Sequence, residues 1–237
     1  MKALILAAGI GSRLAPLTYE CPKSLVKVNG KSIIFKQIEN LHENGIFDIT
    51  IISGYKAEIL EQAVSAKYPD VEFIRNESYI NTNNMYSAYI SRQKFENSEF
   101  LMMNADVFFD SSVIMTLLNH ISENSIVTDI DHYLEESMKV VERNGRIVEI
   151  SKSITENLAL GSSIDVYKFS PRAGEYFFAK CAEYIEDKKN LKLWSEVALN
   201  NILREIEFKA CPLNGRWYEI DSHDDLVKAE ELFKEIK

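Results

Sequence analysis

Short apolar runs and amphipathic stretches alternate along the first half of the chain. Four runs are largely apolar and end at glycine or at polar turn residues: 2–7, 48–53, 71–75 and 99–103. Runs of this length predict β-strands, and their nearly continuous apolar character is typical of a parallel sheet that is covered on both faces.

Amphipathic stretches separate these runs. Residues 32–44 carry isoleucine and leucine at helical spacing and end at Asn44-Gly45, which is a helix C-terminal signal. Residues 56–67 predict a second helix. Strand–helix alternation predicts an α/β fold with a doubly wound, mostly parallel sheet, whose ligands bind at the carboxyl ends of the strands. Three stretches fall at such ends: 8–23, 76–87 and 104–110.

The second half of the chain is less regular. Asn144-Gly145 is a strong turn signal and predicts a hairpin over residues 136–150. The other predicted elements are strands at 125–128, at 161–169 and from 217, and helices at 173–187, at 193–205 and at the C-terminus. No shift in composition divides the chain, so residues 1–237 are expected to form one domain.

Charge and cysteine content exclude several classes of protein. The chain has 237 residues and a formal net charge of −9, without a basic run that could follow a nucleic-acid backbone. Its three cysteines lie far apart, which favours neither a disulfide framework nor a metal cluster. No apolar run approaches the roughly 20 residues of a membrane span, and the first strand follows no export signal. A cytoplasmic protein without nucleic-acid or membrane partners is expected.

The loop after the first strand is the strongest candidate for chemistry. Residues 8–14, AGIGSRL, match two glycines of the dinucleotide fingerprint, but Leu14 stands where the third would be, and no P-loop motif is present. A flexible loop remains, whose backbone N–H groups can approach an anion beside the cations Arg13 and Lys23. A plain turn with solvated cations is the alternative.

A wider stretch makes this loop specific. Residues 4–34, LILAAGIGSRLAPLTYECPKSLVKVNGKSII, closely resemble the signature of the sugar-phosphate nucleotidyltransferases, Ala-Ala-Gly-x-Gly-x-Arg-Leu-x-Pro-Leu-Thr followed by Pro-Lys-x-Leu and Gly-Lys. The resemblance implies a Rossmann-like mixed, mostly parallel sheet flanked by helices. It implies that residues 1–110 form the nucleotide-binding half and residues 111–237 the acceptor-binding half.

The resemblance also implies roles for the residues of this loop. Arg13 and Lys23 would hold the phosphates that leave as pyrophosphate, where fixed cations help most because negative charge develops there. The nucleotide itself would contact Leu6, Ala7, Ala8, Gly9 and Gly11.

Residues 81–90, NTNNMYSAYI, are expected to read the base. Hexose-1-phosphate members of the family carry a Gly- and Gln-containing loop here, which this chain lacks. The pattern resembles instead the branch typified by phosphocholine cytidylyltransferases. Asn83, Asn84 and Ser87 can donate to and accept from a pyrimidine edge. The alternative is an Asn-rich helix cap.

Two distant aspartates match the metal ligands of the family. Asp106 directly follows an apolar strand, and Asp221 matches the aspartate of the segment Trp-x-x-Ile/Val-Asp-Thr-Pro-Glu-Asp-Leu. Carboxylate oxygens at these positions suit Mg²⁺. The resemblance makes Asp106 catalytic together with Arg13 and Lys23. For Asp221 a helix cap is the alternative.

Four residues of the second half are candidates for the acceptor site. Lys152 is the best match to a family lysine that contacts the acceptor's phosphate, although a solvated lysine explains it equally well. Tyr167, Trp194 and Glu196 could bind a cationic amine, because aromatic rings and a carboxylate suit such a group. Core packing is the alternative for Tyr167 and Trp194.

The resemblance as a whole implies a Mg²⁺-dependent cytidylyltransferase. CTP would donate CMP to a small phosphorylated acceptor, phosphoglutamine or phosphocholine, and pyrophosphate would leave. The product would serve the decoration of a cell-surface polysaccharide such as a capsule. Two alternatives stay open, namely a hexose-1-phosphate uridylyl- or thymidylyltransferase and a catalytically silent nucleotide-sensing subunit. The oligomeric state is left open.

Overall fold

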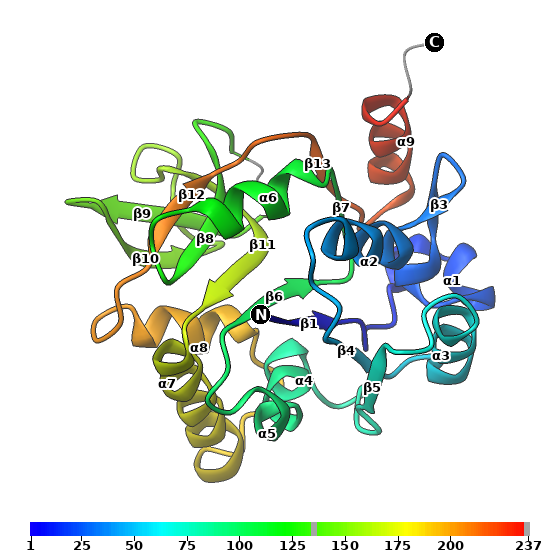
Figure 1. Ribbon diagram of the computed structural model, residues 1–237, viewed down its shortest axis with the longest axis horizontal. Coiled ribbons are helices and arrows are strands. Elements are labelled where there is room, and N and C mark those ends of the chain that lie inside the picture. The colour runs from blue at the N-terminus through cyan, green and yellow to red at the C-terminus, as the bar shows by residue number, and fades with distance from the viewer. Residues whose placement is uncertain (134–136, 235–237) are drawn as a thin grey trace.

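A computed structural model describes residues 1–133 and 137–234. The central sheet runs in the order β10-β9-β11-β6-β1-β4-β5, and β8 joins it by pairing with β11 and β12 (Figure 1). Its strands are β1 Lys2–Leu6, β4 Ile49–Ser53, β5 Glu72–Arg75, β6 Phe100–Asn104, β8 Ser125–Ile130, β9 Lys139–Arg143, β10 Arg146–Ser151, β11 Gly161–Phe169 and β12 Lys209–Pro212.

The four strands predicted from the first half form the parallel core of this sheet. β1 lies between β4 and β6, and β5 adds to the outer side of β4, all in parallel pairing. Each predicted strand agrees with the observed one to within about one residue. The near-continuous apolar runs arise because both faces of these strands are covered.

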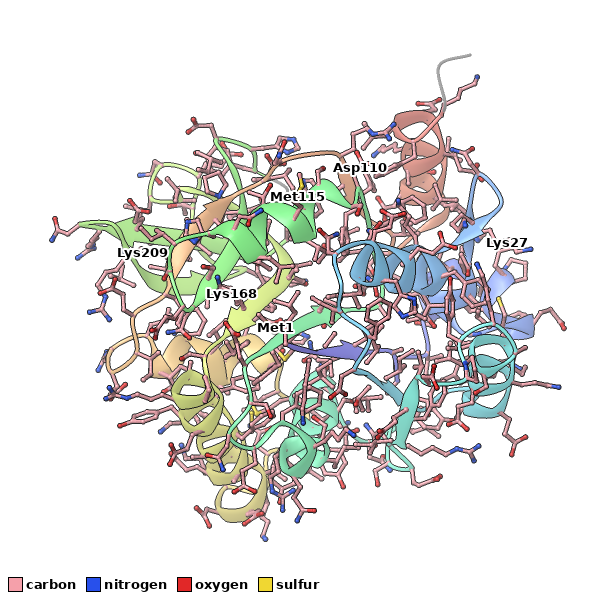
Figure 2. All side chains as sticks on the ribbon, viewed as in Figure 1. Met1, Lys27, Asp110, Met115, Lys168 and Lys209 are labelled. Atoms are coloured by element: carbon pink, nitrogen blue, oxygen red, sulfur yellow. The ribbon has the colours of Figure 1, made fainter. Side chains whose placement is uncertain are left out.

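Helices cover both faces of the sheet, as expected for this fold class. They are α1 Leu17–Glu20, α2 Ile33–Glu43, α3 Ala57–Ser65, α4 Asn84–Ile90, α5 Arg92–Phe95, α6 Ser112–Asn119, α7 Pro171–Ala182, α8 Ser195–Ile202 and α9 His223–Leu232. Alternate residues of the strands pack against α2, α3 and α6 on one face and against α4, α7 and α8 on the other. Charged side chains such as that of Lys27 project outward (Figure 2).

A stack of aromatic rings anchors the second face. The rings of Phe100 and Phe169 lie parallel with their centroids 4.9 Å apart, and Phe177 and Phe208 pack around Phe169. All four side chains are fully buried. Burial of such a side chain contributes about 1.5–3 kcal/mol, so this stack fixes α7 on the sheet next to the cavity described below.

β11 interrupts the parallel pattern and makes the sheet mixed. It pairs antiparallel with β6, β8 and β9, and its register with β8 shifts between Ser163 and Tyr167. Within this bulge Asp165 has a φ of 57°, a left-handed conformation that is uncommon outside glycine. Bulges redirect side chains, and this one places Asp165 in the cavity at the end of β6.

The second half confirms the predicted hairpin in its described part. β9 and β10 meet at Asn144 and Gly145, whose φ values of 54° and 73° are those of a type I′ turn. Residue 136, the predicted start of the hairpin, lies outside the described residues. The predicted helices at 173–187 and 193–205 correspond to α7, followed by a wider turn over Glu183–Asp187, and to the shorter α8.

Two small ribbons lie beside the central sheet, and of their strands only the one expected from residue 217 was predicted. β2 Lys27–Val28 pairs with β3 Lys31–Ser32, and β7 Val107–Phe109 pairs with β13 Trp217–Glu219. The β7–β13 ribbon brings the C-terminal segment beside the end of β6, and Ile220 N donates to the Asp106 carbonyl over 2.9 Å. It therefore joins two distant parts of the chain at the carboxyl edge of the sheet.

Among the helices described, none combines the length and the apolar character needed to cross a bilayer.

Candidate active site

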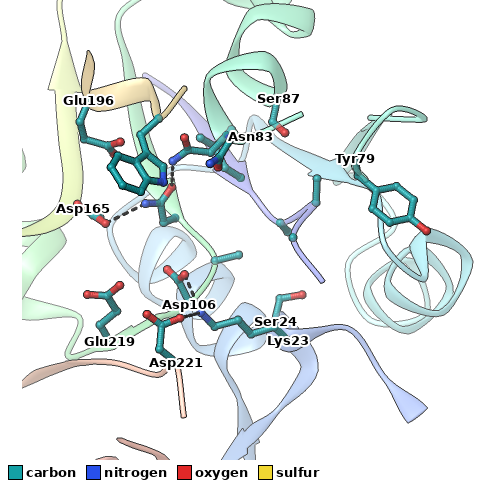
Figure 3. A pocket seen from close by; sticks show the side chains of 18 of the residues that line it. Lys23, Ser24, Tyr79, Asn83, Ser87, Asp106, Asp165, Glu196, Glu219 and Asp221 are labelled. Atoms are coloured by element: carbon teal, nitrogen blue, oxygen red, sulfur yellow. Dashed lines mark hydrogen bonds and ion pairs between the residues drawn. The ribbon is translucent and has the colours of Figure 1, made fainter. Parts of the chain in front are cut away.

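A cavity of about 240 Å³ opens at the carboxyl ends of β1 and β6 (Figure 3). Every residue predicted for the site lines it, except Gly11 and Tyr167. The predicted lining residues are Leu6, Ala7, Ala8, Gly9, Arg13, Lys23, Asn83, Asn84, Ser87, Asp106, Lys152, Trp194, Glu196 and Asp221. The fold thus brings residues from both predicted halves of the chain to one place.

Gly11 shapes the loop from outside the cavity. Its φ is 65°, and a Cβ atom at this position would lie 2.8 Å from Lys23 Cβ. Only glycine lets the loop lie directly against the Lys23 side chain without strain. The Thr18 hydroxyl donates to the Gly11 carbonyl over 3.1 Å and holds the loop in this position.

An acidic cluster lies at one end of the cavity. Asp106, Glu219 and Asp221 each offer a carboxylate oxygen, and these oxygens lie within 4.8 Å of one another. Lys23 Nζ donates to Asp106 Oδ2 over 2.9 Å and to Asp221 Oδ1 over 2.5 Å. Arg13 Nη2 donates to Asp221 Oδ2 over 2.6 Å. The four residues predicted for phosphates and metal therefore form one ionic network.

The electrostatics follow from this crowding. Burial, and then the nearby carboxylates of Asp106 and Asp165, raise the pKa of Glu219 to about 9. Burial also opposes ionisation of Asp221, but Lys23 and Arg13 outweigh it and lower the Asp221 pKa. Lys23 loses hydration through burial, yet its two carboxylate partners raise its pKa.

The acidic cluster fits a divalent cation. Asp106 Oδ1 is buried and has no hydrogen-bond partner among the described residues, so one hard oxygen is left for a further ligand. Carboxylate oxygens are the donors that Mg²⁺ takes. Asp106, Asp221 and Glu219 are the residues that would hold the ion. Glu219 was missed from the sequence, although its place two residues before Asp221 in an extended segment was a usable signal.

A second pair of carboxylates, Asp165 and Glu196, lines the same cavity, and Asp165 is near enough to Glu219 to raise its pKa. Glu196 is buried and Asp165 is half-buried, and the Tyr167 hydroxyl lies 2.8 Å from Asp165 Oδ1 and 3.1 Å from Glu196 Oε1. Burial, followed by repulsion from Glu196, raises the pKa of Asp165 to about 7, and burial raises that of Glu196. Glu196 Oε2 has no partner within residues 1–133 and 137–234.

Tyr167 and Trp194 differ in their surroundings. Tyr167 is only 1% exposed and belongs to the core, so its ring does not line the cavity and its hydroxyl orients the two carboxylates instead. Trp194 is 45% exposed, which contradicts the core alternative. The Lys152 ammonium lies 5.3 Å from the centre of the Trp194 ring, a cation–π distance.

The start of α4 forms a third wall. Asn83 caps the helix by accepting from Asn84 N over 2.8 Å, as the alternative interpretation expected. Asn84 Oδ1 accepts from Ser195 N over 2.8 Å, and Ser87 Oγ accepts from Asn76 Nδ2 over 3.1 Å. Each predicted base-reading side chain thus has a partner within the protein. The wall also contains Asn76, Tyr79 and Thr82, which the sequence did not single out.

The chain was next compared with known proteins. A family model described as nucleotidyl transferase matches residues 2–154. The chain belongs to this family. Choline-phosphate cytidylyltransferase of Streptococcus pneumoniae is 31% identical, with 99% of both chains covered. CTP:phosphoglutamine cytidylyltransferase of Campylobacter jejuni is 28% identical, covering 95% of this chain and 98% of the relative.

A solved structure agrees with these relatives. The structure of CTP:phosphocholine cytidylyltransferase from S. pneumoniae superimposes with a TM-score of 0.81 at 28% identity, covering 98% of this chain and 99% of the other. The match confirms the predicted Rossmann-like mixed sheet of the nucleotidyltransferases.

Proposed function

We propose that the protein transfers CMP from CTP to a phosphate oxygen of a small acceptor and releases pyrophosphate. Two similar relatives carry cytidylyltransferase names, which supports CTP as the nucleotide. The observation that carries the proposal is that one cavity holds two groups of side chains. Arg13, Lys23 and the acidic cluster form the first group, called the phosphate end below. Asp165, Glu196, Lys152 and Trp194 form the second group, called the acceptor end below.

The phosphates of CTP bind at the phosphate end of the cavity. Arg13 and Lys23 neutralise the charge that develops on the leaving pyrophosphate, and the backbone around Ala8 and Gly9 lies against the nucleotide. Asp106 and Asp221 would hold Mg²⁺, with Glu219 beside them, and the ion supplies further charge neutralisation of the phosphates. Asn83, Asn84 and Ser87 would form the wall beside the base.

The acceptor's phosphate is oriented by Lys152. A phosphate monoester has a second pKa of about 6 and is mostly a dianion near neutral pH. Its oxygen can attack the α-phosphorus of CTP in line without a general base, and the bond from that phosphorus to the pyrophosphate breaks. Catalysis then rests on positioning and charge neutralisation.

The carboxylates of the acceptor end, Asp165 and Glu196, favour an acceptor that carries an ammonium group. Among the described residues, Asp165 and Glu196 accept hydrogen bonds from hydroxyl and amide groups, which carry no positive charge, and burial raises the pKa of both carboxyls. An acceptor ammonium supplies that charge, and the exposed face of Trp194 suits a cation. Phosphocholine and phosphoglutamine both carry one, whereas a hexose 1-phosphate does not.

The cellular role is part of the same proposal. The product would be a CDP-activated small molecule, made in the cytoplasm and used to decorate a cell-surface polysaccharide such as a capsule.

Pyrophosphate release tests the function directly. The purified protein with Mg²⁺ is given CTP, UTP or dTTP, each with phosphocholine, phosphoglutamine or glucose 1-phosphate. Release that requires CTP and an ammonium-bearing acceptor is expected. Release only with glucose 1-phosphate and UTP or dTTP identifies a hexose-1-phosphate enzyme. CTP binding without release from any pair favours the nucleotide-sensing subunit.

A further inference from the structure

The ammonium group of Lys23 occupies the place of a cation between the two metal-binding aspartates. It donates to Asp106 over 2.9 Å and to Asp221 over 2.5 Å, and Glu219 lies beside the same oxygens (Figure 3). The side chain of Lys23 is only 13% exposed. In the protein without ligands, Lys23 therefore supplies the positive charge that this acidic cluster needs.

The Lys23 ammonium cannot make its strongest contacts with the carboxylates and with the leaving phosphates at the same time. The proposed function requires Lys23 on the leaving phosphates, while here both its strong contacts are to metal-binding carboxylates. A divalent ion on Asp106 and Asp221 would repel an ammonium held by the same carboxylates, because like charges at contact distance disfavour each other. Binding of the ion and retention of both Lys23 contacts are therefore in competition.

Packing limits where the displaced ammonium can go. The Lys23 stem lies against Gly11, where even a Cβ atom would come within 2.8 Å of it. The side chain is thus confined beneath the loop of residues 8–14 and cannot extend freely into solvent. Its remaining accessible partner is an anion in the cavity, which the nucleotide phosphates provide.

We propose that Lys23 is an internal counter-ion that exchanges with the divalent cation. It balances Asp106 and Asp221 in the empty protein, and it transfers to the nucleotide phosphates when the ion takes its place. The inference rests on the proposed function. Because binding couplings are reciprocal, the tethered ammonium weakens metal binding in the absence of nucleotide, and nucleotide removes that competitor.

Metal binding without nucleotide tests the exchange. Mn²⁺, a paramagnetic substitute for Mg²⁺, is titrated into the wild-type protein, K23M and K23Q, and the free ion is followed by electron paramagnetic resonance. We expect K23M and K23Q to bind Mn²⁺ about tenfold more tightly than wild type, within the range of typical couplings. K27M is the matched control, because Lys27 lies exposed on β2, and its affinity should equal that of wild type.

Thermal unfolding gives a second readout that does not depend on activity. Without metal, K23M leaves Asp106 and Asp221 without their central counter-charge, so its Tm should be below that of wild type. The same concentration of Mn²⁺ should raise the Tm of K23M more than that of wild type, since the stabilisation of the folded state grows with the logarithm of the Mn²⁺ concentration divided by Kd.

Equal or weaker Mn²⁺ binding by both folded variants would overturn the exchange. This outcome is distinct from failure of the proposed function, which appears as absence of CTP-dependent pyrophosphate release by the wild-type protein. An active wild type with unchanged metal affinity in the variants overturns the exchange alone.

Discussion

The two groups of carboxylates in the cavity differ in how their negative charge is balanced. At the phosphate end, Asp106 and Asp221 are paired with Lys23 and Arg13 before any ligand binds. At the acceptor end, Asp165 and Glu196 share buried space with a tyrosine hydroxyl and an asparagine amide, and burial raises the pKa of both carboxyls. In our proposals, Lys23 at the phosphate end exchanges with a divalent cation, whereas an ammonium group of the acceptor neutralises the carboxylates at the acceptor end.

The largest effect is expected from a change at the phosphate end. Asp106→Ala removes a carboxylate that we propose as a metal ligand, and we expect kcat/KM to fall about 10²–10³-fold, because charge neutralisation at the leaving group is lost. Pyrophosphate release at saturating Mg²⁺ measures this. D70A alters an exposed aspartate in a turn and should behave as wild type. An active D106A would place the metal elsewhere.

A change at the acceptor end should affect only the acceptor. Glu196→Gln keeps the shape but removes a negative charge, so KM for an ammonium-bearing acceptor should rise roughly tenfold, the equivalent of about 1.4 kcal/mol. The Kd for CTP should not change. E205Q, at an exposed glutamate, is the control. A parallel loss of CTP affinity would show that the two ends are not separate.

The pH dependence of the unfolding free energy should reveal the raised pKa of Asp165. The folded-state pKa of Asp165 is about 7, above its ordinary value of 3.8, so its ionisation opposes folding and stability falls as pH rises from about 4 to about 7. Asp165→Asn removes this cost. We expect the Tm of D165N to exceed that of wild type at pH 8 by several degrees, and the difference to shrink at pH 5.

The control for that measurement is D70N, which should show no such pH-dependent difference. A Tm of D165N below wild type at both pH values would mean that the carboxylate is compensated in the folded protein.

The smallest effect is expected at the start of α4, which forms one wall of the cavity. Asn83→Ala removes the helix cap and should cost about 1 kcal/mol of unfolding free energy. If Asn83 acts only as a cap, the preference for CTP over UTP should not change. N81A, at an exposed position just before the helix, should alter neither quantity. A changed nucleotide preference would assign Asn83 to the base.

The comparison also explains what the sequence could predict. Arg13 and Lys23 belong to one contiguous stretch whose loop and turns form locally, so their motif can be recognised in the sequence. The parallel strands could also be predicted from the sequence, because burial on both faces produces a continuous apolar run. Asp106 and Asp221 could each be predicted as candidates. Their proximity depends on the pairing of β7 with β13, and strands of three residues are too short to show which partner they pair with.

The acceptor end was much less predictable. Asp165 faces the cavity because of a bulge in β11, and a bulge of this kind leaves no simple periodic signal in a single sequence. Tyr167 was expected to line the site, yet alternation along β11 directs its ring into the core while its hydroxyl reaches Asp165 and Glu196. Sites assembled from strand irregularities and distant helices require the tertiary structure.

The ribbon that joins β7 to β13 has a consequence for the order in which the protein becomes competent during synthesis. Asp106 leaves the ribosome long before Asp221, and β13 must pair with β7 before the second carboxylate can lie beside the first. A nascent chain that has formed its parallel sheet still lacks Glu219 and Asp221, two of the three carboxylates of the acidic cluster, until residues 217–221 have emerged. The acidic cluster is therefore completed only once both strands of the ribbon have been synthesised and have paired.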